Sequence, residues 1–408
     1  MSDAPGDTVG VRDPSPALPF DQVRVAYIGV AVAFTLNGLL LGTWAPRIPE
    51  VQAHLGIGPG DLGFTLLALA VGSLCAMPLT GWVMSRHGSS KVLLPATLAA
   101  CLLPGLIGTA DSMPGIWPIL LLWGIALGAM DVAMNTQAVA VQHHHPRTVI
   151  NGIHACFSLG GLLGAALGTG ASAASIPVTW HLVGVGLCGL VASVLVLRKL
   201  VPDPAASPSS PDEPAGPSAP ARRRGTMGAL ALLCAAAFGA MLAEGAVADW
   251  SAIRMKEAGV STGAAGIGYT DFALAMFIGR ACGDTIAQRV GHARMAAAVA
   301  LVGCLGTLVG FALPSPAAAA LAFAALGLGL SCIMPFLFAL AGGDGNGTPV
   351  AVTAVGTSGY VGLLVGPAAI GVLAELYGIV AALWVLPVLL LLSGLPAVAA
   401  ARSVNGRT

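Results

Sequence analysis

The sequence predicts an all-α integral membrane protein with twelve transmembrane helices in two pseudo-symmetric six-helix bundles. Three observations predict it: the composition, the number of long apolar runs, and an internal repeat. Of the 408 residues, 56% are apolar and 9% are charged, whereas soluble domains carry roughly 25% charged residues. A soluble chain of this composition would expose large apolar patches, so we expect lipid to surround most of it.

Twelve apolar runs are long enough to cross a bilayer. A span needs about 20 residues to cross roughly 30 Å of hydrocarbon. Backbone groups in lipid must be hydrogen-bonded within the segment, so each span is expected to be a helix. The predicted spans are 25–44, 62–84, 92–110, 116–141, 149–171, 178–198, 227–250, 265–285, 294–313, 316–341, 351–374 and 379–400.

The basic residues predict the orientation. Of the 18 Lys and Arg residues, fourteen fall in loops and tails on the side of the N-terminus. Three lie on the opposite side (Arg47, Arg254 and Lys256), and Arg280 lies within a span. Because basic loops stay in the cytoplasm, we expect a multi-pass protein of the cell inner (plasma) membrane with both termini cytoplasmic.

The longest gap between spans divides the chain in two. It is rich in proline and ends in Arg222, Arg223 and Arg224, a composition typical of a flexible linker. The predicted organisation is a disordered cytoplasmic tail (1–24), a first six-helix bundle (25–198), a cytoplasmic linker (199–226), a second six-helix bundle (227–401) and a cytoplasmic tail (402–408).

The two halves are related in sequence. Residues 63–91 align with residues 266–294 at a constant offset, which pairs Arg86 with Arg289 and Lys91 with Arg294. Each segment is the second span of its half plus the turn that follows. Parallel repeats of six spans suit alternating access, in which two bundles rock around a central site.

The turn from Gly81 to Lys91 resembles the loop motif of the major facilitator superfamily, G-x-x-x-D-R-x-G-x-[RK]-[RK]. Its second copy runs from Asp284 to Arg294. The first copy has Ser85 where the family usually has Asp. The resemblance covers the whole membrane domain and implies a transporter fold, in which we expect Arg86, Lys91 and Arg289 to serve gating. Arg280 and Asp284 lie one helical turn apart, and we interpret them as a structural or gating pair.

Spans four and five are similar to the fucose-permease branch of that superfamily, and span seven to a related bacterial inner-membrane subgroup. The similar features are Asp131 followed by Asn135, and the polar start of span five with Asn151 and His154. The resemblance implies proton symport of a sugar-like solute with the proton on Asp131. The family's acidic residue in span one is absent, and Asn37 occupies that region.

Polar side chains inside the spans are the candidate site. A charge at the bilayer centre is costly, so such residues face a cavity or find a partner. We expect Asp131 and Glu244 to take part in proton coupling. Each also has a structural interpretation as a buried packing contact. The expected solute-binding residues are Asn37, Asn135, Asn151, His154 and Glu244.

Other residues have structural roles in this interpretation. Asp249 and Trp250 are expected near the outer interface, with Trp250 as a membrane-interface residue. Glycines from Gly160 to Gly168 in span five and from Gly362 to Gly371 in span eleven predict close helix contacts. His143, His144 and His145 are interpreted as a solvated loop. The eight cysteines lie in apolar stretches without C-x-x-C spacing, so we expect no metal and no cofactor.

The leading hypothesis is therefore a secondary active transporter, and two alternatives to its preferred form stay open. Proton-coupled symport of a small polar solute is preferred, and a proton-coupled exporter of a metabolite or drug is the second hypothesis. A third is a membrane scaffold or sensor that transports nothing. No nucleophile elbow, phosphate loop or dinucleotide fingerprint occurs in the sequence, so we expect no enzyme, no nucleic-acid partner and a monomer whose partners are the solute, protons and lipid.

Overall fold

The computed structural model describes residues 19–145, 149–202, 220–342 and 349–405, and all regular elements in these ranges are helices. Much of the predicted tail 1–24 and linker 199–226 therefore lies outside the described residues. The helices begin earlier than the predicted spans, at Phe20 and at Pro220. Hydropathy marks where a segment enters lipid, whereas helical hydrogen bonds can continue into the polar flank.

The first half contains six of the membrane-crossing segments. The first continues through a short 3-10 turn into a small helix, and the third ends in a 3-10 segment. The elements are α1 (Phe20–Trp44), η1 (Ala45–Arg47), α2 (Ile48–Leu55), α3 (Pro59–His87), α4 (Ser89–Leu102), η2 (Leu103–Thr109), α5 (Met113–His144), α6 (Ile150–Ala173) and α7 (Val178–Val196).

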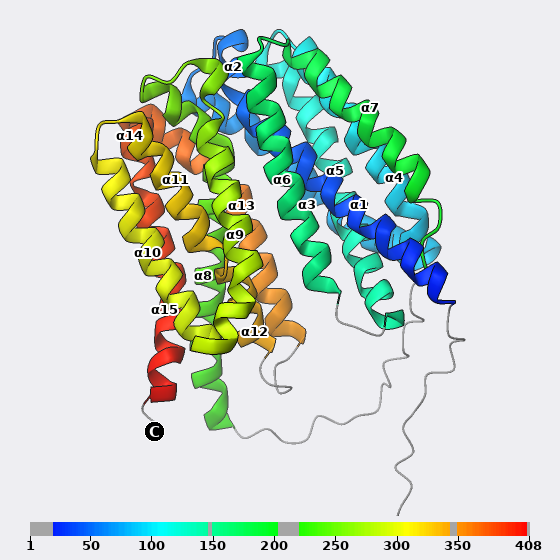
Figure 1. The fold of residues 1–408 in the computed structure, drawn as a ribbon, viewed down its shortest axis with the longest axis vertical. Helices are drawn as coiled ribbons and strands as arrows, with labels where there is room; N and C mark the ends of the chain where they lie inside the picture. Colours follow the sequence, from blue (N-terminus) through cyan, green and yellow to red (C-terminus); the bar gives the residue numbers. More distant parts are fainter. Residues whose placement is uncertain (1–18, 146–148, 203–219, 343–348, 406–408) are drawn as a thin grey trace, which may run out of the picture.

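The second half repeats this plan, with its fourth and sixth spans each divided into two consecutive helices. The two halves stand side by side in Figure 1. The elements are α8 (Pro220–Glu257), η3 (Thr262–Ala264), α9 (Ile267–Val290), α10 (His292–Ala312), α11 (Pro316–Leu330), α12 (Ile333–Gly342), α13 (Pro349–Tyr377), α14 (Ile379–Leu383) and α15 (Val385–Asn405).

Within the described ranges, eleven segments are long and apolar enough to cross a membrane. The twelfth, α9, lies at the predicted span 265–285 and carries Asp271 and Arg280 within it. These charges lower its mean hydropathy, although it packs among the other helices against α6 and α11. The predicted all-α fold with two six-helix bundles is confirmed.

Glycines bring helices of each half into backbone contact, as their spacing predicts. A Cβ atom built on Gly160 would lie 2.0 Å from the Thr35 carbonyl oxygen of α1, and one on Gly164 would lie 2.3 Å from that of Leu39. In the second half, a Cβ on Gly362 would lie 2.2 Å from the Phe238 oxygen of α8. The pairs α1–α6 and α8–α13 therefore pack at a distance that only glycine permits.

The repeated loop motif forms the same turn twice. Gly88, between α3 and α4, and Gly291, between α9 and α10, have φ values of 82° and 93°. Residues with a Cβ rarely adopt such angles. The aligned glycines therefore have the same structural role in both halves.

The two halves meet closely at one end of the bundle. We call it the α2 end, and we call the opposite end, where α8 begins and α15 finishes, the terminal end (Figure 1). A Cβ on Gly63 of α3 would lie 3.0 Å from the Cα of Gly371 in α13. A Cβ on Gly263 would lie 2.8 Å from the Cα of Ala173 at the end of α6. Backbone contacts between α3 and α13, and between η3 and α6, therefore close the interface between the halves at the α2 end. We call this interface the seam.

Adding one methyl group should separate α6 from α1. We expect Gly164→Ala to destabilise the protein by ~1–3 kcal/mol, because the methyl group would meet a backbone oxygen that cannot move alone. Gly170→Ala, in the same helix with open space around it, is the matched control and should be neutral or slightly stabilising. Thermal unfolding in detergent measures both, and equal melting temperatures would contradict the packing argument.

Candidate solute and proton site

Asp131 links the two halves. It lies on α5, is half-buried, and its Oδ2 accepts a hydrogen bond from the Tyr360 hydroxyl of α13 at 2.5 Å. The side chain of Asn135, one turn further along α5, donates to Asp131 Oδ1 at 3.3 Å and to the Asp131 carbonyl at 2.9 Å. The predicted pairing of Asp131 with Asn135 on one helix face is therefore observed.

Arg280 makes a second contact between the halves. Its Nη1 donates to Ser158 Oγ of α6 at 2.8 Å. Its Nη2 lies 3.8 Å from Glu244 Oε2 of α8, with both side chains about a quarter exposed. An ion pair at this distance is loose, so the guanidinium and the carboxylate can also take other partners.

Further polar groups surround Arg280. His154 is exposed and lies on the same helix as Ser158. It is within electrostatic range of the Arg280 guanidinium. We define the central polar site as Asp131, Asn135, His154, Ser158, Glu244, Arg280 and Tyr360.

Two predicted solute-binding residues fall elsewhere. Asn37 is buried within α1, with 3% of its surface exposed, one turn from Phe34, whose ring packs edge-on against His154 at 5.0 Å. Its burial favours a packing role in this conformation. Asn151 begins α6 close to the terminal end, but its side chain lies outside the described residues.

The predicted gating residues separate into two groups. Arg86, Lys91 and Arg289 are exposed at the terminal-end turns, and the Arg86 guanidinium lies 4.0 Å from the centroid of the Trp82 ring. Arg280 belongs instead to the central polar site. The side chain of Asp284 lies outside the described residues, so its pairing with Arg280 stays a prediction.

Trp250 is placed differently from its prediction. It is fully buried, with 0% of its surface exposed, so its ring does not face the lipid as a membrane-interface residue would. Its position near the end of a hydropathic run suggested the interface, but α8 is an inner helix that other helices cover at this level. Within the described ranges its indole nitrogen has no hydrogen-bond partner.

Sequence reasoning missed Tyr360 and Ser158 as site residues. One signal was available, because the chain has only four tyrosines and three of them (Tyr27, Tyr269 and Tyr360) lie within predicted apolar spans. A phenol in lipid usually needs a hydrogen-bond partner. The identity of the partner could not be predicted, since Tyr360 and Asp131 are 229 positions apart.

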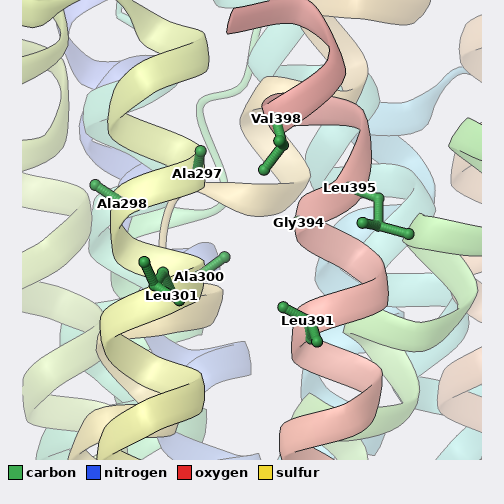
Figure 2. A pocket seen from close by; sticks show the side chains of 8 residues that line it. All are labelled: Ala297, Ala298, Ala300, Leu301, Leu391, Gly394, Leu395 and Val398. Atoms are coloured by element: carbon green, nitrogen blue, oxygen red, sulfur yellow. The ribbon is translucent and has the colours of Figure 1, made fainter. Parts of the chain in front are cut away.

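An apolar pocket lies away from these residues. It has a volume of about 240 Å³ and lies between α10 and α15 (Figure 2). Its eight lining residues are apolar, among them Ala297, Leu301, Leu391 and Leu395. With no polar group to orient a solute, this groove is unsuited to the chemistry of the central polar site.

A polar network lies at the closed α2 end. Arg47, with 0% of its side chain exposed, donates through Nη2 to Glu50 Oε2 at 2.7 Å and to the Ile176 carbonyl at 2.5 Å. Ser172 of α6 donates to Glu50 Oε1. Ser172 Oγ also lies 3.3 Å from the Thr262 carbonyl of the second half, so the network extends across the seam.

Comparison with known proteins assigns the family. The family model described as Major Facilitator Superfamily matches residues 28–346. The chain belongs to the major facilitator superfamily. It is 34% identical over 373 residues to an uncharacterized MFS-type transporter of Yersinia pestis, covering 89% of this chain and 93% of that protein. It is 30% identical to the membrane protein MosC of Rhizobium meliloti, covering 87% and 85% of the two chains.

Solved structures of major facilitators share the fold. The nucleoside transporter NupG superposes with a TM-score of 0.66 at 13% identity, covering 92% of this chain and 98% of that one. A bacterial homologue of the human lysosomal transporter Spinster, in an inward-facing and unoccupied conformation, gives 0.65 at 16% identity, covering 94% and 96%. These similarities show the fold. By its family, this chain is a multi-pass membrane protein of a transporter superfamily, and its resemblance to the fucose-permease branch stays a prediction.

The Arg47 network should hold this major facilitator closed at the α2 end. Glu50→Ala would leave a buried guanidinium without its counter-charge, and we expect the closed conformation to lose ~1–3 kcal/mol. This is less than for a fully buried pair, because Glu50 keeps 24% of its side chain exposed. The measurement uses spin labels carried on unnatural amino acids at the exposed positions His54 and Leu376. In Glu50→Ala, the distribution of distances between the labels should include an additional population at longer distance.

The matched control is Asp111→Ala. Asp111 pairs with His54 at the same end, but 90% of its side chain is exposed, and such surface pairs contribute little. For this control the label at His54 is moved to Ala53. The His54–Asp111 pair is then intact in the labelled protein that does not carry the Asp111→Ala substitution. Equal distance distributions for Glu50→Ala and the parent would contradict the role of the network.

Proposed function

We propose that the protein is a proton-coupled symporter that moves a small polar solute across the cytoplasmic membrane by alternating access. The observation that carries the proposal is the hydrogen bond from Tyr360 to Asp131, which ties a carboxylate of one half to the other half. A carboxylate at such a seam can change its bonds when it gains a proton. Proton binding and movement of the halves can then depend on each other.

The remainder of the central polar site suits the solute. Glu244, Arg280 and His154 offer charged and neutral hydrogen-bonding groups, and Asn135 an amide, at the junction of the two halves. The loose pairing of Arg280 with Glu244 supports a role in binding, since a solute hydroxyl or carboxylate can replace one partner. In this proposal Glu244 serves both binding and proton coupling. Arg86, Lys91 and Arg289 then act at the terminal-end gate.

The proposal also assigns the two ends. The terminal end would face the cytoplasm, with both chain termini there, because most Lys and Arg residues of the sequence flank that end. The closed α2 end would then face outward, and the described conformation would be open toward the cytoplasm. The protein would act as a monomer, since each chain contains both halves of the site.

Proton movement driven by a solute tests the proposal. The protein is reconstituted into liposomes that hold a pH dye, and small sugars and other polar metabolites are added outside. We expect the lumen to acidify with a transported solute. Asp131→Asn should abolish this signal, because an amide cannot take up the proton, while exchange of labelled for unlabelled solute persists.

Asp111→Asn, a change of the same chemistry at an exposed position, should leave the proton signal intact. Lumenal alkalinisation by an added solute would overturn symport and favour the exporter. Proton movement that survives in Asp131→Asn would overturn the assignment of the proton site.

A further inference from the structure

Tyr360 makes an asymmetric contact with the carboxylate of Asp131. The two oxygens of Asp131 are bonded to different halves of the molecule: Oδ1 to Asn135 on its own helix, and Oδ2 to Tyr360 on α13. The O···O distance of 2.5 Å is at the short end of the range for a hydroxyl that donates to an ionised carboxylate. With 37% of its surface exposed, Tyr360 reaches this contact from the space between the halves.

A proton on Asp131 would change this contact. An ionised carboxylate accepts only, so the Tyr360 hydroxyl must donate. Once Oδ2 carries a proton, the pair becomes a bond between neutral groups, which is about half as strong as a charge-assisted one. The longer bond from Asn135 to Oδ1 weakens as well, but the bond from Asn135 to the Asp131 carbonyl lies within α5 and is unaffected. Protonation therefore weakens the contact between the halves and leaves the local one.

We propose that Tyr360 is the positioning residue through which the second half senses whether Asp131 carries a proton. The inference rests on the proposed function, in which Asp131 is the proton site. While the carboxylate is ionised, Tyr360 holds α13 against α5 and stabilises the conformation that is closed at the α2 end. When Asp131 is protonated, this conformation loses its advantage and the halves can rock.

The sign of the pH dependence follows from this contact. The bond is strong above the titration of Asp131 and weak below it. The population closed at the α2 end is therefore high at high pH and falls as the pH falls. Because Tyr360 favours the ionised form in this conformation, it also promotes release of the proton there.

Other ionisable groups also surround the pair and could contribute to a pH response. Helices α1 and α4, which also pack against α5, carry charges near the terminal end. Ionisable groups on the elements that pack against α5 or α13 include His154 on α6, Glu244 on α8, Cys75 on α3, Arg24 on α1 and Lys91 on α4, and Arg280 of α9 bonds to Ser158 of α6. A test must therefore change the phenol hydroxyl alone.

Tyr360→Phe removes that hydroxyl and keeps the ring. The measurement is the distance between the spin labels at His54 and Leu376 across a pH series, with protons as the only ligand. In the parent protein we expect the ratio of closed to open conformers to change ~10-fold between the two protonation states of Asp131. In Tyr360→Phe we expect a change of less than ~2-fold, with the ratio near its acidic value at all pH values.

Two further variants separate sensing from a structural role. Tyr377→Phe, on the same helix but 70% exposed, should keep the full pH response. Replacement of Tyr360 by 3,5-difluorotyrosine keeps a donor of greater acidity, and should keep the response with a shifted midpoint. This variant also decides the matter if Tyr360→Phe fails to fold: a response identical in amplitude and midpoint to the parent would overturn the proposal.

Asp131→Asn distinguishes failure of this inference from failure of the proposed function. It should remove the pH response of the labelled protein and the proton signal in liposomes. If it removes both while Tyr360→Phe retains the full pH response, Tyr360 is not the sensor and the proposed function stands. If it leaves the proton signal intact, the proton site itself is wrong.

Discussion

The structure depends on one constraint: lipid offers no hydrogen bonds, so backbone polar groups in the membrane must be paired within the protein, and charged side chains there are costly unless they find partners. The backbone meets this demand locally, through helices. The side chains cannot do so alone, and Asp131, Arg280, Ser158 and Tyr360 meet it by pairing across the two halves. The same demand that makes the chain helical therefore gathers its polar groups at the seam where the halves can move.

The contacts within each half and those between the halves differ in kind. Helices α1 and α6 pack backbone to backbone through glycines, as do α8 and α13. These contacts are extensive and would break only if a half came apart. The polar contacts across the seam are few, and those of the central polar site remain partly exposed. Rigid halves joined by a small number of exchangeable bonds are the arrangement that rocking requires.

The contacts between the halves at the α2 end differ in burial from those at the central polar site. At the α2 end, Arg47 is fully buried and the contacts include backbone packing of Gly63 on Gly371. At the central polar site, the Arg280–Glu244 pair is loose at 3.8 Å and accessible to solvent. Buried charges without water need their partners continuously, whereas accessible ones can exchange a protein partner for a solute. The closed α2 end and the proposed binding site therefore lie at different positions along the interface between the halves.

Much of the fold could be predicted from the sequence, because its determinants are local. Apolar runs, basic loops and the repeated glycines at positions 88 and 291 each report on a short segment, and the helices and turns lie where these features predict them. Hydropathy was less informative at Trp250. The sequence suggested a membrane-interface residue there, whereas the structure buries this side chain among helices. Burial by neighbouring helices and exposure to lipid call for the same apolar residues, so composition cannot separate them.

In the candidate site, too, contacts within one helix could be predicted from the sequence, whereas contacts between helices could not. Sequence alone determined that Asp131 and Asn135 share a helix face, since four positions make one turn, and that acids within spans need partners. Only the tertiary structure decided that the partner of Asp131 is Tyr360 and that Arg280 contacts Ser158, 122 positions away. Helix periodicity relates residues within one span, whereas the meeting of two spans depends on how whole bundles pack, which no short stretch of sequence encodes.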